Sequence, residues 1–154
     1  MEITLKHTDA SHASHSDFIT LVSHLDADLK IRDGDDHEFY NQFNGIEALK
    51  HCIVAYHGNH AVGCGAIKPL DDTSMEVKRM FVFPEQRGKG IATTILKALE
   101  QWTKILGYTS CKLETGIKQP EAIALYKRNG YNIISNYGQY EGVENSVCFE
   151  KKIL

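Results

Sequence analysis

The stretch FVFPEQRGKGIATTIL, residues 81–96, constrains the fold of this chain more than any other part of its sequence. Its apolar run stops at Pro84, a residue that cannot donate a hydrogen bond within a central strand. Gly88 and Gly90 follow, and from Gly90 onward apolar residues recur with the period of a helix. The segment therefore predicts a strand, a tight turn and an amphipathic helix in direct succession.

Strand and helix patterns alternate along the rest of the 154 residues. A hairpin is predicted over residues 52–70, with a loop at His57, Gly58 and Asn59 that is slightly longer than two residues. The other strands are expected at residues 1–7, 74–83, 108–116, 131–137 and 146–154, and the helices at 11–29, 46–51, 90–107 and 120–129. This order predicts one α/β domain, residues 1–154, in which helices pack on a mixed sheet.

Charge and cysteine usage narrow the class of protein. A net charge of -3 argues against broad nucleic-acid binding, which needs a basic surface. No apolar run approaches the length that spans a membrane, and the first residues lack the pattern of a signal peptide. Cys52, Cys64, Cys111 and Cys148 lie in apolar stretches without a C-x-x-C pair. They are expected to be reduced core thiols of a cytoplasmic protein.

The turn at residues 87–92 has two interpretations. A helix N-terminus offers unpaired N–H groups and the positive end of the helix dipole, so it can hold phosphate oxygens. The alternative is a glycine turn with solvated cations, which an isolated pattern of this kind favours. The sequence contains no P-loop motif, and the Rossmann pattern fails because Thr93 stands where its third glycine belongs.

A wider pattern separates the two interpretations. Arg87, Gly90 and Ala92 match [QR]-x-x-G-x-[GA], and the segments EVKRMFVFPEQRGKGIATTIL, GYTSCKLETG and QPEAIALYKRNGY follow one another in order. In these motifs the second half of the chain resembles the GNAT superfamily of acetyl-CoA-dependent N-acetyltransferases, whereas the first half agrees only in element order. The resemblance implies a mixed, mostly antiparallel twisted sheet of about seven strands flanked by about four helices.

The resemblance also implies how acetyl-CoA would bind. The pantetheine arm would pair with backbone groups of Met80, Phe81 and Val82. Gln119 stands where the family usually has asparagine, so the cofactor contact of that side chain is in doubt. The pyrophosphate would be held by the N–H groups of six consecutive residues: Arg87, Gly88, Lys89, Gly90, Ile91 and Ala92.

Three residues are candidates for proton transfer. Tyr126 matches the tyrosine that protonates the departing thiolate in the family, and a phenol with an ordinary pKa near ~10 stays a donor at neutral pH. Alternatively, Tyr126 is a core aromatic residue. Glu76 is either the general base or a surface strand glutamate paired with a lysine. Glu114 is a second candidate base, or a residue that orients the ends of separating strands.

The predicted reaction is direct transfer of acetyl from acetyl-CoA to a primary amine, and a small molecule is favoured over a protein as the acceptor. The alternative is a non-catalytic acyl-CoA-binding regulatory protein. A covalent route through Cys111 ranks low, and no metal is expected because His7, His12, His15 and His24 lack a ligand spacing. Homodimerisation, common in the family, stays open.

Two further segments are ambiguous. Tyr137 and Tyr140 either line an acceptor pocket or pack beside a turn, and the acidic residues between Asp26 and Glu38 either border the acceptor or form a solvated face.

Overall fold

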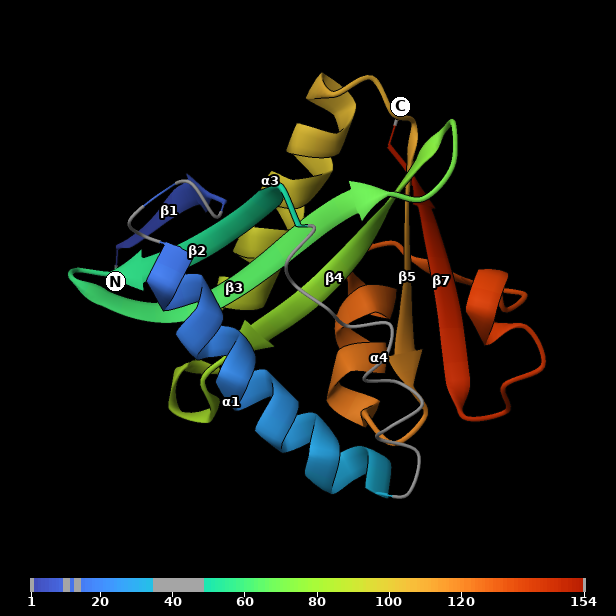
Figure 1. The fold of residues 1–154 in the computed structure, drawn as a ribbon, viewed down its shortest axis with the longest axis horizontal. Helices are drawn as coiled ribbons and strands as arrows, with labels where there is room; N and C mark the ends of the chain where they lie inside the picture. The colour runs from blue at the N-terminus through green and yellow to red at the C-terminus, as the bar shows by residue number, and fades with distance from the viewer. Residues whose placement is uncertain (1, 10–11, 13–14, 35–48, 154) are drawn as a thin grey trace.

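The computed structural model describes residues 2–9, 12, 15–34 and 49–153 (Figure 1). Seven strands form one sheet in the order β1-β2-β3-β4-β5-β7-β6, and all neighbours are antiparallel except β4 and β5. The strands are β1 (Ile3–Thr8), β2 (His51–His57), β3 (His60–Pro69), β4 (Ser74–Val82), β5 (Ser110–Gly116), β6 (Asn132–Ile134) and β7 (Ser146–Lys152). The expected mixed and mostly antiparallel sheet is confirmed.

Helices cover both faces of this sheet, α1 in front and α3 behind in the view of Figure 1. In the described part of the chain the α-helices are α1 (His15–Asp33), α3 (Ile91–Ile105) and α4 (Pro120–Arg128), and single 3₁₀ turns occur at η2 (Pro84–Gln86) and η3 (Gly138–Tyr140). For the short helix expected at residues 46–51, residues 46–48 lie outside the described residues. Leu49 and Lys50 are not helical, and His51 already opens β2.

The alternation of side chains in β2 explains the two layers. Ile53 and Ala55 are fully buried against α3, whereas Cys52 and Val54 are fully buried on the opposite face against α1. Successive side chains of a strand point to opposite faces, so a strand with both faces covered reads as a continuous apolar run. Because β2 and β3 are covered in this way, this part of the sheet has a hydrophobic core on each face.

The β2–β3 hairpin is tighter than the sequence predicted. His57 pairs with His60, so only two residues form the loop, and the expectation of a slightly longer loop is wrong. Gly58 has a φ of 61°, a conformation that glycine adopts without strain. This backbone allows two residues to reverse the chain with the twist that hairpins prefer.

The four cysteines are buried free thiols, as their apolar surroundings predicted. Burial raises the pKa of Cys52 to about 12 and that of Cys148 to about 11, so these thiols are protonated at neutral pH. Burial also raises the pKa of Cys111, whose sulfur lies 3.5 Å from Oγ1 of Thr103. A thiol of this kind is a poor nucleophile, which agrees with the low rank of a covalent route.

The feature that shapes the site is the separation of β4 from β5. These strands pair only where Ser74, Met75 and Glu76 meet residues 110–112, and beyond this point no pairing joins them. Across the sheet, β4 carries a bulge, because Lys78 pairs with Ala66 and Phe81 with Cys64. A bulge increases local twist and bends its strand, which favours the opening between β4 and β5.

Candidate active site

Two hollows meet where β4 and β5 separate. The charged cavity lies on the α1 side and contains Glu76, Lys78, Arg79 and Glu114, with Leu25, Leu29 and Tyr140 in its walls. The helix groove runs from the end of β4 past the N-terminus of α3 and along α4. The two hollows share five lining residues: Leu25, Met80, Gln119, Ala122 and Tyr126. A molecule in one hollow can therefore touch a molecule in the other.

The helix groove has an open helix N-terminus at its centre. Gly90 is the N-cap of α3, and no side chain in the described part of the chain caps this helix. Gly88 and Gly90 both have a φ of 79°, and a Cβ built on either residue would meet no atom within 4 Å. The backbone of the turn thus faces open space, and the first N–H groups of α3 can serve as anion donors.

Most of the residues expected to hold acetyl-CoA line this groove. Gln119 is among them, at the N-cap of α4. Lys89 is absent from the lining, and its Nζ donates to Oε1 of Gln86 at 3.2 Å. The expected residues that do line the groove are Met80, Phe81, Val82, Arg87, Gly88, Gly90, Ile91, Ala92, Gln119 and Tyr126.

Arg87 is held back against β4. Its Nε donates a hydrogen bond of 2.8 Å to the carbonyl oxygen of Val82, and its guanidinium lies 5.8 Å from the ring centroid of Phe81. One acceptor position of the Val82 carbonyl is therefore already used within the chain. The remaining N–H groups of this guanidinium keep a positive charge beside the turn.

Tyr126 lies at the junction of the two hollows. It is 6% exposed, and its ring packs edge to face with that of Tyr131 at 5.8 Å and near that of Phe149. Burial raises the pKa of Tyr126, and the charge of Glu114 adds to this effect. The phenol is therefore a proton donor at neutral pH. Tyr126 belongs to the core and also faces the cavity, so the two alternatives do not exclude each other.

Glu76 is a buried residue of the charged cavity. It is 1% exposed, so the alternative of a surface strand glutamate is wrong, although a lysine is its neighbour. Its Oε2 accepts a hydrogen bond of 2.5 Å from the hydroxyl of Tyr137, and its Oε1 lies 3.9 Å from Nζ of Lys78. Burial and the charge of Glu76 raise the pKa of Tyr137, which stays a donor.

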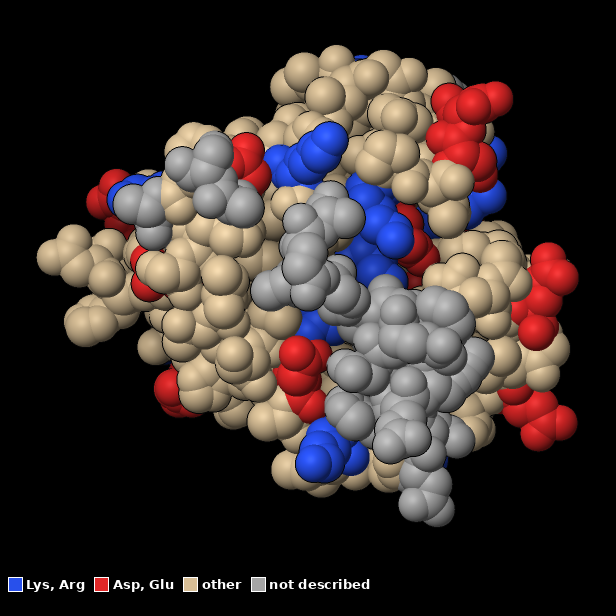
Figure 2. Space-filling model, viewed as in Figure 1, with Lys and Arg blue, Asp and Glu red and all other residues tan. Residues whose placement is uncertain are grey.

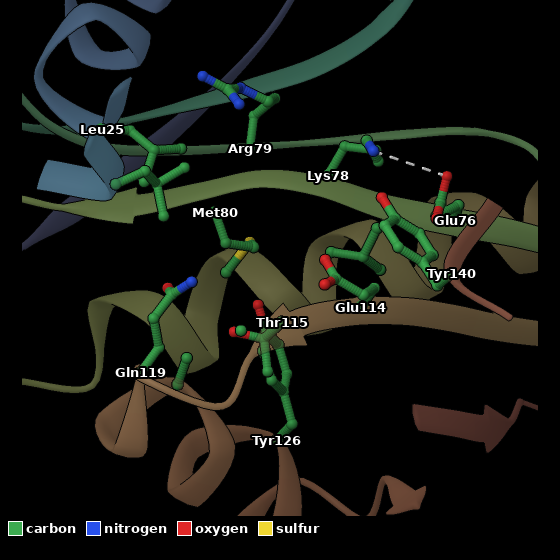
Figure 3. Close-up of a pocket in the computed structure, with 14 residues that line it drawn as sticks. Leu25, Glu76, Lys78, Arg79, Met80, Glu114, Thr115, Gln119, Tyr126 and Tyr140 are labelled. Carbon is green, nitrogen blue, oxygen red and sulfur yellow. Dashed lines mark ion pairs between the residues drawn. The ribbon is translucent and has the colours of Figure 1, made fainter. Parts of the chain in front are cut away.

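Glu114 provides a second carboxylate in the same cavity. Its Oε2 accepts a hydrogen bond of 2.7 Å from Oγ of Ser146 on the neighbouring strand β7. Figure 3 shows its carboxylate directed into the space between β4 and α4, with the ring of Tyr140 beside it. The structure thus brings both candidate bases to one cavity.

Two buried cations of this cavity were missed from the sequence. Lys78 is 8% and Arg79 is 6% exposed, and the latter forms an ion pair with Asp26 of α1. Figure 2 shows basic side chains gathered in a hollow of this face beside acidic ones. The alternation Glu76-x-Lys78 places both side chains on one face of a strand, and this signal was available in the sequence. The bulge at Arg79 was not.

The acidic residues of α1 have specific partners. Asp26 pairs with Arg79, and Asp28 lies 3.2 Å from Nε of Arg32. Arg32 also forms an ion pair with Glu121 of α4, so it joins the end of α1 to α4 across the helix groove. The side chain of Asp33 and residues 35–38 lie outside the described part of the chain.

Comparisons with known proteins agree with this geometry. A sequence profile of the Acetyltransferase (GNAT) family matches residues 19–131. The chain belongs to the GNAT family. This GNAT protein is therefore an acyltransferase. It is 36% identical over 102 residues to the IAA acetyltransferase of Azospirillum brasilense, and the aligned residues cover 66% of this chain and 67% of the relative.

Solved GNAT structures share the fold over nearly the whole chain. A crystal structure from Klebsiella pneumoniae, assigned as an acyl-CoA N-acyltransferase, aligns with a TM-score of 0.81 and 29% identity over 99% of this chain and 98% of that one. A GNAT family acetyltransferase from Elizabethkingia anophelis with acetyl-CoA bound aligns with a TM-score of 0.66 and 20% identity over 97% of both chains. The second likeness shows the fold alone.

The described residues also bear on membrane insertion and on metal binding. None of the helices in this part of the GNAT chain is both long and apolar enough to cross a membrane. Within the same residues, no group of three or more His, Cys, Asp or Glu side chains is arranged to hold a metal ion.

Proposed function

We propose that this enzyme transfers the acetyl group of acetyl-CoA to a primary amine of a small molecule, directly and within a ternary complex. The observation that carries the proposal is the meeting of the helix groove and the charged cavity at Met80 and Tyr126. A cofactor in the groove and an amine in the cavity would touch there. Acetyl-CoA or CoA is present in GNAT neighbours of the same fold, which supports the choice of cosubstrate.

The groove offers a place for each part of acetyl-CoA. The N–H groups of residues 87–92 would hold the pyrophosphate, because the turn is open and α3 lacks a side-chain cap in the described residues. The pantetheine arm would pair with β4 at residues 80–82, where β5 has already separated from this strand. That edge of β4 is free to accept an added neighbour.

The charged cavity offers the groups that move protons. The amine nitrogen would attack the thioester carbonyl carbon and lose its proton, directly or through a water, to Glu76. The carbon–sulfur bond would then break, and the sulfur would take a proton from the hydroxyl of Tyr126. Glu76 would release the proton of the amine to solvent, and solvent would supply a new proton to the phenol. Glu114 is the alternative base, because it lines the same cavity.

The proposal has a direct test. Purified enzyme with acetyl-CoA and a broad panel of amines should release free thiol in the presence of at least one amine and form the N-acetyl product. Cofactor binding without turnover over the whole panel would instead support the regulatory alternative. The buried Glu76 and Tyr126 favour the enzyme, since a sensor needs neither.

The proposal includes the location, the partners and the oligomeric state of the enzyme. Four buried free thiols are in keeping with a cytoplasmic location. The net charge of -3 is in keeping with small-molecule partners in place of nucleic acid. A homodimer is the oligomer to test first, by light scattering.

A further inference from the structure

Polar contacts join α1 to the sheet near the start of this helix and near its middle. The hydroxyl of Tyr56 on β2 donates a hydrogen bond of 2.6 Å to Oδ2 of Asp17, in the first turn of α1. Further along the helix, Asp26 forms an ion pair with the guanidinium of Arg79 on β4. Tyr56 and Asp17 line neither hollow, whereas Arg79 lines the charged cavity at the bulge of β4.

The backbone of Arg79 is strained. It has a φ of 59°, and no other non-glycine residue in the described part of the chain has a positive φ. The left-handed conformation costs free energy because Cβ crowds the carbonyl oxygen, so a residue keeps it only where the surrounding structure holds it. At this bulge Arg79 and Met80 of β4 together face the single residue Gly65 of β3.

Several contacts hold this backbone in place. The buried side chain of Arg79 pairs with Asp26, the only carboxylate among the described residues within ion-pair distance of its guanidinium. The carbonyl oxygen of Arg79 accepts a hydrogen bond of 3.4 Å from Sγ of Cys64. Gly65 leaves the space that Sδ of Met80 fills, 2.5 Å from where a Cβ would lie. Because a buried charge that loses its partner is strongly destabilised, the bulge depends on the position of α1.

The ion pair lies beside the junction of the two hollows. Leu25, the neighbour of Asp26 in α1, lines both hollows, and so does Met80, the neighbour of Arg79 in β4. Figure 3 shows both of these side chains at the cavity. The ion pair therefore fixes one wall on α1 relative to another wall on β4, at the place where the cofactor and the amine would meet.

We infer that Asp26 and Arg79 are positioning residues for acyl transfer, because their ion pair holds the strained bulge of β4 and the two walls of the junction. This role rests on the proposed function. Arg79 acts through the backbone that it shares with Met80, and neither partner has to touch a substrate. Misplacing the reacting groups by about 1 Å can cost about 10²-fold in rate. The open turn at α3 lies apart from the pair, so acetyl-CoA should still bind when the pair is lost.

Asp26→Asn tests the ion pair in the intact enzyme, with the amine that gives the fastest thiol release. This change removes the charge of a partly exposed side chain and keeps its size, so the fold should be retained. We expect kcat to fall about tenfold or more, while KM for acetyl-CoA stays within about threefold. Asp26→Glu keeps the carboxylate and should recover most of kcat. A normal kcat in Asp26→Asn, or a defect confined to KM for acetyl-CoA, would overturn the inference.

The matched control is Tyr56→Phe. It removes the contact between α1 and the sheet at Asp17 and leaves the bulge unchanged. It should lower the urea midpoint of unfolding and leave kcat within about threefold. Equal losses of kcat in Tyr56→Phe and Asp26→Asn would show that any loosening of α1 has the same effect, and would count against the inference.

Two variants of Arg79 separate its backbone from its charge. Arg79→Gly and Arg79→Ala both remove the guanidinium, but only glycine adopts a φ of 59° without strain. The kcat of Arg79→Gly should therefore exceed that of Arg79→Ala by about threefold or more. Equal kcat values would mean that Arg79 acts through its charge alone, and would overturn the inference.

These outcomes are distinct from a failure of the proposed function. Turnover with normal kcat in Asp26→Asn overturns the positioning role and leaves the acetyltransferase proposal standing. The absence of thiol release by the unaltered enzyme with every amine would contradict the acetyltransferase proposal, and the positioning role with it.

Discussion

The hydroxyl of Tyr137 donates a 2.5 Å hydrogen bond to Oε2 of Glu76, and the two residues are 61 positions apart in the sequence. This contact ties the turn at η3 to the middle of the sheet. Because Glu76 is 1% exposed, its carboxylate depends on such donors. Tyr137 thereby acts as a positioning residue for the proposed base.

Removing this donor should affect both stability and activity. We expect Tyr137→Phe to lower the free energy of unfolding by about 1–3 kcal/mol, the usual penalty for a buried polar group that loses a partner. It should also reduce kcat more than it changes KM for the amine. Urea unfolding and steady-state kinetics measure the two effects. A variant with normal kcat would show that Tyr137 does not position the base.

The identity of the base can be decided by comparing two carboxylates. Glu76→Gln should reduce kcat by about 10²-fold or more and flatten the acidic limb of the pH–rate profile, because an amide cannot accept the proton. Glu114→Gln should keep that limb, since its hydrogen bond with Ser146 suggests a supporting part. The reverse pattern would assign the base to Glu114.

The role of Tyr126 as the acid has a matched control beside it. Tyr126→Phe should lower kcat by about 10²-fold while acetyl-CoA still binds, because only the proton donor is removed. Tyr131→Phe deletes a neighbouring hydroxyl, which donates at 2.9 Å to Oε2 of Glu100 and lies in the core. It should lower stability and leave kcat within about threefold. Equal losses of kcat in both variants would point to packing instead of chemistry.

The open turn at α3 predicts a defect in cofactor binding. Gly90→Ala places a Cβ in the space of the helix groove and forces alanine into a φ of 79°. It should raise the Kd for acetyl-CoA at least tenfold in isothermal titration. Gly107→Ala, at the other end of α3 with a φ of 94°, is the control for backbone strain. Similar Kd values for the two variants would exclude the turn as the pyrophosphate site.

Buried tyrosines should limit stability at high pH. Burial raises the pKa of Tyr126, Tyr131, Tyr137 and Tyr140, and that of Tyr56 rises to about 12. In the unfolded chain a tyrosine ionises near ~10, so between that pH and the folded pKa the folded state holds more protons. The contribution of these tyrosines to the free energy of unfolding should be level below about pH 10 and then fall as pH rises. Urea unfolding at several pH values measures the slope.

An ultraviolet titration of the phenols checks the same point. The buried tyrosines should ionise only together with unfolding. Ionisation of all seven tyrosines near pH 10 in folded protein would contradict the burial of these side chains.

Local patterns in the sequence predicted the elements well. Pro84, the glycines of the turn and the helical period after Gly90 predicted the β4–η2–α3 segment, which the structure has at residues 74–105. These signals are local, because proline and glycine restrict or widen the backbone at their own positions. The two-residue hairpin loop was predicted one residue too long. Whether His57 belongs to the loop or to the strand depends on its pairing with His60, which the local pattern does not show.

Contacts between distant residues were beyond local patterns. The bond from Tyr137 to Glu76 and the ion pair of Arg79 with Asp26, 53 positions away, arise from packing. Strand alternation shows that the Glu76 side chain lies on one of the two faces of the sheet. It does not show whether other elements cover that face. Its burial depends on how η3 and α1 close over the sheet, and so the surface alternative could not be dismissed from the sequence.

The bulge at Arg79 also changes the parity of β4. Glu76 and Lys78 lie on the α1 side, and without an extra residue Met80 would lie there too. Met80 instead packs with the α3 core, and Phe81 takes the α1 side. Before the inserted residue, β4 directs charged side chains into the charged cavity. After it, the alternation is reversed, and the backbone of β4 lines the helix groove. Shortening β4 by one residue here would exchange the two faces of its second half.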